Sequence, residues 1–310
     1  MADLVYLKDV EREPNSVITV GTFDGVHAGH RVLMNTVLEK ARERNARSVI
    51  VTFDPHPREI LNPGDKGIKL LTTLQERCEA LEEIGIDQLL VIPFDRDFSL
   101  LSAEEFVRDI IYQRVGVSEF VIGYDHHFGH DRKGTIETVE RLGKTLGFDT
   151  YVVSRQEVGH ETVSSTAIRE AIGSEGDMEK ATEMLQRRYR LSGTVMHGDK
   201  RGEKIGFPTA NIKPEEPRKI IPKEGVYAVK ARIGEDKWNG MMNIGTRPTF
   251  DGKERTLEVH LFEFDEKIYG KVVEIIFFKR IRDEIKFDCV DELTTQLQKD
   301  ESKARKVLND

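Results

Sequence analysis

The stretch SVITVGTFDGVHAGH, residues 16–30, decides the fold of the first half of the chain. It begins with a continuous apolar run, SVITV, which is typical of a strand buried on both faces of a parallel sheet. The turn that follows contains three glycines, which let the backbone turn tightly and approach a ligand closely. His27 and His30 end the stretch, three positions apart. This order predicts a buried strand, a tight turn and the start of a helix.

The alternation of strands and helices continues to about residue 155. Further apolar or β-branched runs are SVIVTF at 48, LLVIPF at 89, FVIGY at 120 and TYVVS at 150. Between the first two runs, Met34, Val37 and Ala41 keep helical spacing and form an apolar stripe. Ser102 with Glu105 has the pattern of a capping box, which predicts another helix start. These features predict a doubly wound α/β domain with a parallel, Rossmann-like sheet.

From Leu191 onward the strand pattern changes. The runs GVYAVKARI at 225, WNGMMNIG at 238, LEVHLFEF at 257 and KVVEIIFFKRI at 271 follow one another without intervening helices. Such runs predict antiparallel pairing and, at this size, a small barrel or sandwich. Helical spacing of apolar residues predicts a final helix at about 290–308. We therefore expect an N-terminal domain, residues 1–185, and a C-terminal domain, residues 186–310.

Composition limits the classes of function. The chain has 310 residues, of which 38% are hydrophobic and 33% charged, as is typical of a soluble globular protein. It lacks a run of ~20 apolar residues and a secretory pattern, so we expect a cytoplasmic protein without a membrane partner. The formal net charge of -8 argues against nucleic-acid binding. Cys78 and Cys289 lie far apart, which favours reduced thiols over a zinc cluster or a disulfide framework.

The glycine turn and the helix start after it are suited to bind phosphate. A helix N-terminus offers unpaired N–H groups and a partial positive charge. His27 and His30 can both face one anion and donate hydrogen bonds as charge accumulates between the α- and β-phosphates of a nucleotide. On its own, such a pair is more often a solvated helix start. A second donor-rich segment, VSSTAIRE at 163, follows the fifth strand and favours the phosphate interpretation.

Motifs of the first half resemble one known family. HAGH at 27–30 with SSTAIR at 164–169 resembles the paired signatures of class I nucleotidyltransferases. GTFDGVHAGH, TFDPHP at 52 and GYDHHFGHDRKG at 123 are similar to the adenylyltransferase half of prokaryotic bifunctional riboflavin kinase/FAD synthetases. The resemblance implies that the nucleotide and its phosphates are bound by Gly21, Phe23, Asp24, Gly25, Ser164, Ser165, Thr166 and Arg169, with His27 and His30 in catalytic roles. It implies that the flavin is bound by Pro55, His56, Pro57, Asp125 and Phe128.

Two of these segments have other interpretations. TFDPHP on its own is a proline-rich turn that closes a strand. Asp125, His126, His127 and His130 suggest a metal site, but their spacing fits no common zinc signature. Many members of the family carry an aromatic residue or an arginine where His126 and His127 stand, so the resemblance assigns these two histidines no flavin contact.

The second half carries a glycine-rich, basic segment, HGDKRGEKIGFPTANI, from residue 197. Such a loop can wrap a polyphosphate with its backbone N–H groups and with Lys200, Arg201 or Lys204. A glycine-rich loop alone is a weak indication of a nucleotide site.

Three oxygen-bearing side chains complete the candidate site. Thr209 and Asn211 lie on one side of an extended segment and offer oxygen atoms of the type that Mg²⁺ accepts. A kinase for an alcohol also needs a proton acceptor, and Glu258 in LEVHLFEF is the candidate. Alternation places Glu258 and His260 on one face of the strand, and by pattern alone a solvent-facing carboxylate is the more frequent interpretation.

The motifs of the second half resemble the riboflavin kinase module of the same family. The similar segments are HGDKRGEKIGFPTANI, GVYAV at 225, NIGTRPTF at 243 and EVHLF at 258. The resemblance implies a small Greek-key barrel in which PTAN binds Mg-ATP through Thr209 and Asn211 while Glu258 acts as the base. It also implies nucleotide contacts for Gly198, Lys204 and Gly206 and a flavin contact for Arg247.

The combined resemblance implies an enzyme that phosphorylates riboflavin to FMN and adenylylates FMN to FAD. Its co-substrate would be ATP with Mg²⁺, and its partners would be small molecules. We expect a monomer or a weak homo-oligomer that binds no nucleic acid. The alternatives are another nucleotidyltransferase, which leaves the motifs after residue 193 unexplained, and a flavin carrier without turnover. A tRNA-binding protein related to the synthetases is disfavoured by the acidic charge balance.

Overall fold

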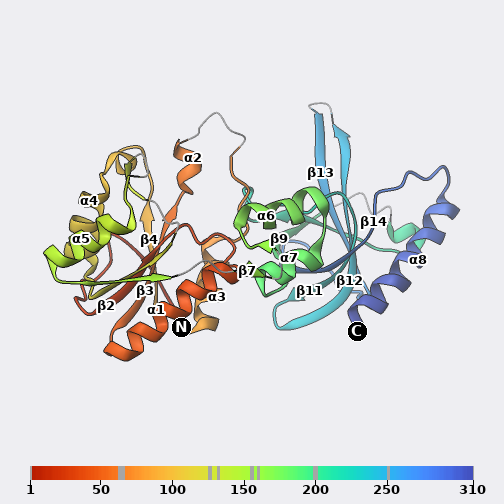
Figure 1. Ribbon diagram of the computed structural model, residues 1–310. Helices are drawn as coiled ribbons and strands as arrows, with labels where there is room; N and C mark the ends of the chain where they lie inside the picture. Colours follow the sequence, from red (N-terminus) through yellow and green to blue (C-terminus); the bar gives the residue numbers. More distant parts are fainter. Residues whose placement is uncertain are drawn as a thin grey trace. The chain divides into compact units, whose positions relative to one another are not determined.

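The computed structural model describes residues 2–61, 67–124, 128–130, 133–153, 157–158, 161–197, 202–249 and 252–309. The chain forms two compact units, Met1–Ser165 and Thr166–Asp310 (Figure 1). This division falls before the predicted boundary at 185/186, and the domain limits 1–185 and 186–310 remain a prediction about which segments fold independently.

The first unit contains a parallel six-stranded sheet in the order β1-β4-β3-β2-β5-β6. Its strands are β1 (Asp3–Tyr6), β2 (Ser16–Val20), β3 (Arg47–Asp54), β4 (Gln88–Pro93), β5 (Glu119–Gly123) and β6 (Asp149–Val153). The five strands expected from the apolar runs are confirmed. The sequence pattern missed β1, because this short edge strand is half exposed and lacks a continuous apolar run.

Helices connect the parallel strands, as the fold class requires. They are α1 (Ala28–Arg44), α2 (Pro57–Leu61), α3 (Leu74–Ile84), the 3-10 turn η1 (Phe98–Leu100), α4 (Ala103–Glu105), the π-helix η2 (Phe106–Val115) and α5 (Ile136–Leu146). Ser102 and Glu105 form the predicted capping box at the start of α4. The helix then continues as a π-helix, and the Gly116 N–H donates to the Ile111 carbonyl five residues before it. A short hairpin, β7 (Glu157–Val158) and β8 (Glu161–Thr162), follows β6.

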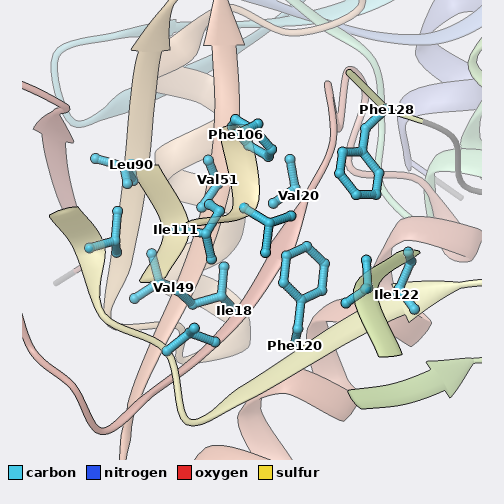
Figure 2. Packing of buried hydrophobic residues seen from close by; sticks show 14 of the residues in the cluster. Ile18, Val20, Val49, Val51, Leu90, Phe106, Ile111, Phe120, Ile122 and Phe128 are labelled. Atoms are coloured by element: carbon cyan, nitrogen blue, oxygen red, sulfur yellow. The ribbon is translucent and has the colours of Figure 1, made fainter. Parts of the chain in front are cut away.

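Both faces of the sheet are buried, which explains why its strands read as continuous apolar runs. Alternate residues of β2 enter different clusters: Ile18 and Val20 pack on one face and Val17 on the other. Figure 2 shows the first cluster, in which side chains from β2 to β5 meet Phe106 and Ile111 of η2. The core therefore holds the strand ends, and the loops that follow them, in a fixed frame.

The second unit is built on a closed antiparallel barrel in the order β10-β13-β12-β11-β14-β9. Its strands are β9 (Arg190–Met196), β10 (Ala210–Pro214), β11 (Gly225–Ile233), β12 (Asp236–Thr249), β13 (Gly252–Leu261) and β14 (Val272–Arg282). This confirms the predicted antiparallel barrel. Tyr227 and Phe277 are fully buried and meet edge to face. Burial raises the pKa of Tyr227 to about 12, and its hydroxyl donates to the Lys223 carbonyl.

Helical segments precede and follow the barrel strands in the chain, and a 3-10 turn lies between β9 and β10. They are α6 (Ser165–Glu170), the π-helix η4 (Ala171–Glu175), α7 (Met178–Leu185), the 3-10 turn η5 (Gly202–Ile205) and α8 (Val290–Asn309). The final helix, expected at about 290–308, is confirmed by α8. Its Ala304 and Leu308 pack with Met241 and Phe262 of the barrel region. Within the described ranges, no helix combines the length and the apolar character needed to cross a bilayer.

Candidate functional site

The first candidate site lies where the strand order of the parallel sheet reverses. β2 is flanked by β3 on one side and β5 on the other, and the chain moves outward in both directions from it. In such sheets, ligands bind beyond the carboxyl ends of the strands at this switch point. The turn Gly21–Gly25 begins directly after β2 and leads into α1. The topology therefore places the histidine motif where this fold class binds its ligands.

The backbone of this turn is unusual. Phe23 and Val26 have φ values of 46° and 42°, in the left-handed region that side-chain-bearing residues rarely adopt, and Gly25 has φ 95°. A Cβ atom at Gly21 would lie 2.9 Å from the ring of Phe23, so a larger residue would displace that ring. The residues between β2 and α1 thus form one compact, strained unit whose shape depends on its neighbours.

His27 and His30 come together at the start of α1. His27 is the N-cap residue, and its Nδ1 accepts a hydrogen bond from the His30 backbone N–H at 3.3 Å. The two rings stack with their centroids 3.5 Å apart, and Phe23 meets His30 edge to face at 5.2 Å. Because Nδ1 of His27 accepts, the hydrogen of its neutral ring lies on Nε2. The structure thus brings both imidazoles to one helix N-terminus, with His27 only 6% exposed.

Asp24 is bonded to the loop at residues 70–73. It is 1% exposed, and its carboxylate accepts hydrogen bonds from the backbone N–H groups of Leu71 and Thr72 and from the Thr72 hydroxyl at 2.9–3.0 Å. The Gly25 N–H in turn donates to Thr72 Oγ1 at 2.9 Å. The resemblance implies that Asp24 binds the nucleotide. In the structure its carboxylate instead accepts hydrogen bonds from within the protein, and these fix the shape of the turn.

The TFDPHP segment closes β3 and starts α2. Asp54 is the last residue of β3, and α2 begins at Pro57. Nδ1 of His56 accepts from the Arg58 N–H at 3.2 Å, and the His56 N–H donates to Glu59 at 3.3 Å. These bonds hold His56 in the turn between Pro55 and Pro57, at the carboxyl edge of the sheet.

A group of aromatic rings lies beside this turn. Phe53 of β3 contacts Phe94 and Phe98 at centroid distances of 5.6 and 5.9 Å, and all three side chains are half-buried. Phe128 instead packs in the core on Phe106 and Phe120 and is 8% exposed. Asp125, the neighbouring residue of the motif, lies outside the described residues.

The SSTAIR segment forms the start of α6. Ser164 and Ser165 are half-buried, and the Ser165 hydroxyl donates to the Asp24 carbonyl at 2.9 Å. Thr166 is exposed, and Arg169 lies in the last turn of α6. Ser165 belongs to the first unit and is thus hydrogen-bonded to the turn between β2 and α1, residues 21–27, called the histidine turn below, whereas Thr166 and Arg169 belong to the second unit.

The second candidate site follows one rung of the barrel. Glu258 of β13 pairs directly with Asn211 of β10 and, on its other side, with Asn243 of β12. Directly paired residues of antiparallel strands point to the same face with Cβ atoms about 5 Å apart. All three side chains are half-buried, whereas Leu257 and Val259 on the opposite face of β13 are buried. The structure brings Asn211 and Glu258 together and adds Asn243, which the sequence analysis did not single out.

The PTAN segment is fixed to the same face by His260. Nδ1 of His260 lies 2.7 Å from the Pro208 carbonyl, so it must carry the hydrogen of this bond. The ring lies between Phe207 and Phe262 at centroid distances of 5.3 and 5.8 Å. The next residue, Thr209, is exposed and directly precedes β10.

Other predicted residues of this site are only partly visible. Gly206 follows η5 with φ 80°, a left-handed conformation that suits glycine. Gly198 lies outside the described residues, as do the side chains of Lys204 and Arg247. The described part of the chain contains no group of three His, Cys, Asp or Glu side chains arranged to hold a metal ion. Thr209 and Asn211 are neutral oxygen donors, which suits a magnesium ion that is shared with nucleotide phosphates.

Two family models match successive segments of the chain. A family model described as FAD synthetase matches residues 9–167, and one described as riboflavin kinase matches residues 185–308. The bifunctional riboflavin kinase/FMN adenylyltransferase of Escherichia coli (strain K12) is 38% identical over 293 residues, covering 94% of this chain and 92% of the relative. The protein of the same name from Bacillus subtilis (strain 168) is 37% identical, with coverages of 95% and 93%. The chain belongs to the bifunctional riboflavin kinase/FMN adenylyltransferase family.

The fold of this family member is also found in a solved structure. A crystal structure described as a macrolide-efflux protein from Streptococcus pneumoniae has a TM-score of 0.89 and 34% identity, covering 97% of this chain and 98% of that chain. Its likeness confirms a parallel-sheet unit followed by an antiparallel barrel. The histidine turn lies in the segment matched to FAD synthetase, and the Glu258 rung lies in the segment matched to riboflavin kinase.

Proposed function

We propose that the chain makes two flavin cofactors in sequence. The segment 185–308 transfers the γ-phosphoryl group of ATP to riboflavin and yields FMN and ADP. The segment 9–167 joins AMP from a second ATP to FMN and yields FAD and pyrophosphate. The observation that carries this proposal is that each matched segment contains its own reactive constellation: stacked histidines at a helix start in one, and Glu258 between two asparagines in the other.

In adenylyl transfer, the FMN phosphate is itself the nucleophile. One of its oxygens attacks the α-phosphorus of ATP and pyrophosphate leaves, so no covalent enzyme intermediate is needed. His27 and His30 donate hydrogen bonds to the oxygens on which negative charge accumulates, and the N-terminus of α1 adds its partial charge. Ser164, Ser165, Thr166 and Arg169 provide further donors for the ATP phosphates.

In riboflavin phosphorylation, Glu258 accepts the proton of the ribityl hydroxyl as that oxygen attacks the γ-phosphorus. Thr209 and Asn211 would hold Mg²⁺, since both offer neutral oxygens on the face of the barrel that carries Glu258. When bound, the ion would neutralise part of the negative charge on the ATP phosphates. His260 holds the backbone next to Thr209 and thereby orients the metal-binding segment.

The flavin of the first site requires an apolar surface with polar edges. Phe53, Phe94 and Phe98 form such a surface beside the Pro55–Pro57 turn, and aromatic rings stack favourably on flat heterocycles. Phe128 contributes from the core through Phe106, whose ring contacts Phe128 as well as Phe53 and Phe98. We further propose that the protein acts in the cytoplasm on small molecules alone, as a monomer or a weak homo-oligomer.

Incubation with riboflavin, ATP and magnesium, followed by chromatography over time, tests this function. FMN and ADP are expected first, and FAD and pyrophosphate are expected to follow. A flavin carrier would release no ADP. Another nucleotidyltransferase would leave both riboflavin and supplied FMN unchanged while consuming ATP with a different phosphate ester, such as pantetheine phosphate or a nicotinamide nucleotide.

A further inference from the structure

Arg77 of α3 connects three segments that surround the first candidate site. The side chain is only 4% exposed. Its Nη1 donates to the Thr22 carbonyl and to the Thr52 hydroxyl, each at 3.0 Å, and its Nη2 donates to the Thr72 carbonyl at 3.3 Å. Thr22 belongs to the histidine turn, and Thr52 is the first residue of TFDPHP. One guanidinium group thus joins the turn assigned to ATP with the segment assigned to the flavin.

The same turn is also fixed from its other end. The carbonyl of Thr72 accepts from Arg77. Its hydroxyl donates to the Asp24 carboxylate and at the same time accepts from the Gly25 N–H. The Thr52 hydroxyl also donates to the Thr22 carbonyl at 3.0 Å. Thr72 and Thr52 are 3% and 0% exposed, so water does not compete for these bonds. The backbone from Thr22 to Gly25 is therefore held on both sides immediately before His27.

The position of Arg77 is itself determined by the start of α3. Thr73 caps the helix by accepting from the Glu76 N–H, and the Glu76 carboxylate bonds back to the Thr73 N–H at 2.9 Å. Arg77 follows Glu76 directly, and the capping box sets the direction in which its side chain leaves the helix. The planar guanidinium can then donate to several acceptors at once, which a lysine ammonium on a flexible stem cannot do with the same geometry.

We infer that Arg77 is a positioning residue for adenylyl transfer. Through Thr22, Thr52 and Thr72 it fixes the position of the histidine turn relative to the TFDPHP segment, residues 52–57. This inference rests on the proposed function of the first unit. Arg77 need not touch substrate, because its effect passes through the backbone that ends at His27. A misplacement of about 1 Å in a reacting group can lower a rate about 100-fold. Loosening the turn should therefore reduce kcat for FAD formation by about 10- to 100-fold.

The test compares Arg77→Lys and Arg77→Gln with the wild-type chain. Arg108→Gln is the matched control, because Arg108 is exposed on η2 and pairs with its neighbour Asp109. FAD formation from supplied FMN, FMN formation from riboflavin and thermal unfolding are measured for each protein. Arg77→Lys should lower kcat for FAD formation with a smaller change in KM, and Arg77→Gln should lower it further. Riboflavin phosphorylation and the control should be unchanged.

A rescue experiment separates positioning from general stability. In Arg77→Ala, added guanidinium at millimolar concentration should restore part of the FAD-forming rate, whereas a tetramethylammonium salt at equal ionic strength should not. An unchanged kcat in Arg77→Lys would overturn the inference. A second result would also overturn it: all three variants lose FAD formation and also lose the thermal unfolding transition of the first unit. Arg77 would then be a purely structural residue. Failure of the wild-type chain to form FAD would instead overturn the proposed function.

Discussion

The two candidate sites are positioned by different kinds of bonds. In the first, the side chains of Arg77 and Thr72 hydrogen-bond to the backbone of a turn, and backbone N–H groups of the loop at 70–73 donate to the Asp24 carboxylate of that turn. The site therefore depends on contacts between segments that are distant in sequence. In the second, the ladder between β10, β13 and β12 places Asn211, Glu258 and Asn243 on one rung. A strained turn keeps its shape only with hydrogen bonds from other segments, whereas a strand is held by the backbone hydrogen bonds of the adjacent strands.

The sites also differ in their exposure to solvent. Asp24, His27 and Arg77 are at most 6% exposed, and the turn they surround can exclude water from polar contacts. Glu258, Asn211 and Asn243 are half-buried, and Thr209 is exposed. Electrostatic interactions are stronger where water is excluded, so a neutral ring can stabilise developing charge in the first site. In the second site the proposed proton acceptor, Glu258, is a carboxylate instead of a neutral ring.

The largest effect is expected for Glu258→Gln. The substitution keeps the shape of the side chain but removes its ability to take the hydroxyl proton, and loss of a general base lowers rates by about 10²- to 10⁴-fold. FMN formation from riboflavin should fall by this amount, while adenylylation of supplied FMN should continue at the wild-type rate. Chromatography of both products measures the two reactions in one protein. Normal kinase turnover in this variant would remove Glu258 from the mechanism.

The next largest effect is expected for His27→Ala. Removing one donor to developing negative charge lowers a rate by about 10²- to 10³-fold, and the cap of α1 is lost with the ring. FAD formation should fall by this amount and FMN formation should not change. Because the cap could matter alone, His27→Asn serves as the comparison: it restores a capping side chain without an imidazole. Recovery of FAD formation in His27→Asn would show that the ring acts only as a cap.

Much of the fold could be predicted from the sequence because burial leaves a periodic signal. The runs at β2 and β3 are apolar on both faces, and the stripe of α1 repeats with the helical period. The alternation of β13 likewise predicted that Glu258 and His260 share a face, which the buried Leu257 and Val259 confirm. The short edge strand β1 left no such signal, since its two end residues are exposed and its two central residues are only half-buried.

The sequence could not show which segments meet. In the sequence Arg77 is one of several charged residues of a helix, and only the folded structure shows that it donates hydrogen bonds to Thr22 and Thr52. Asn243 is one polar residue of β12, and its place beside Glu258 depends on a strand register that one sequence does not contain. Phe128 lies in a motif that resembles a flavin segment, yet its ring packs in the core. Residue type and spacing predict chemistry, but contacts between distant segments require the fold.

The smallest effect, for His260→Phe, tests whether the ladder alone positions the second site. Phenylalanine keeps the packing between Phe207 and Phe262 but removes the hydrogen bond to the Pro208 carbonyl. A bond of this kind contributes about 1 kcal/mol, so kcat/KM for riboflavin phosphorylation should fall by about 3- to 10-fold. The loss should lie mainly in KM for Mg-ATP, because the bond holds the backbone beside Thr209.

The matched control for this substitution is His130→Phe, which removes a similar contact between a histidine Nδ1 and the Ser99 carbonyl in the first unit. It should leave riboflavin phosphorylation unchanged. If His260→Phe also leaves KM for Mg-ATP unchanged, the strand ladder suffices to position the kinase residues, and the contrast between the two sites becomes sharper. If its effect equals that of Arg77→Lys on FAD formation, the barrel site depends on side-chain support as much as the turn does, and the contrast fails.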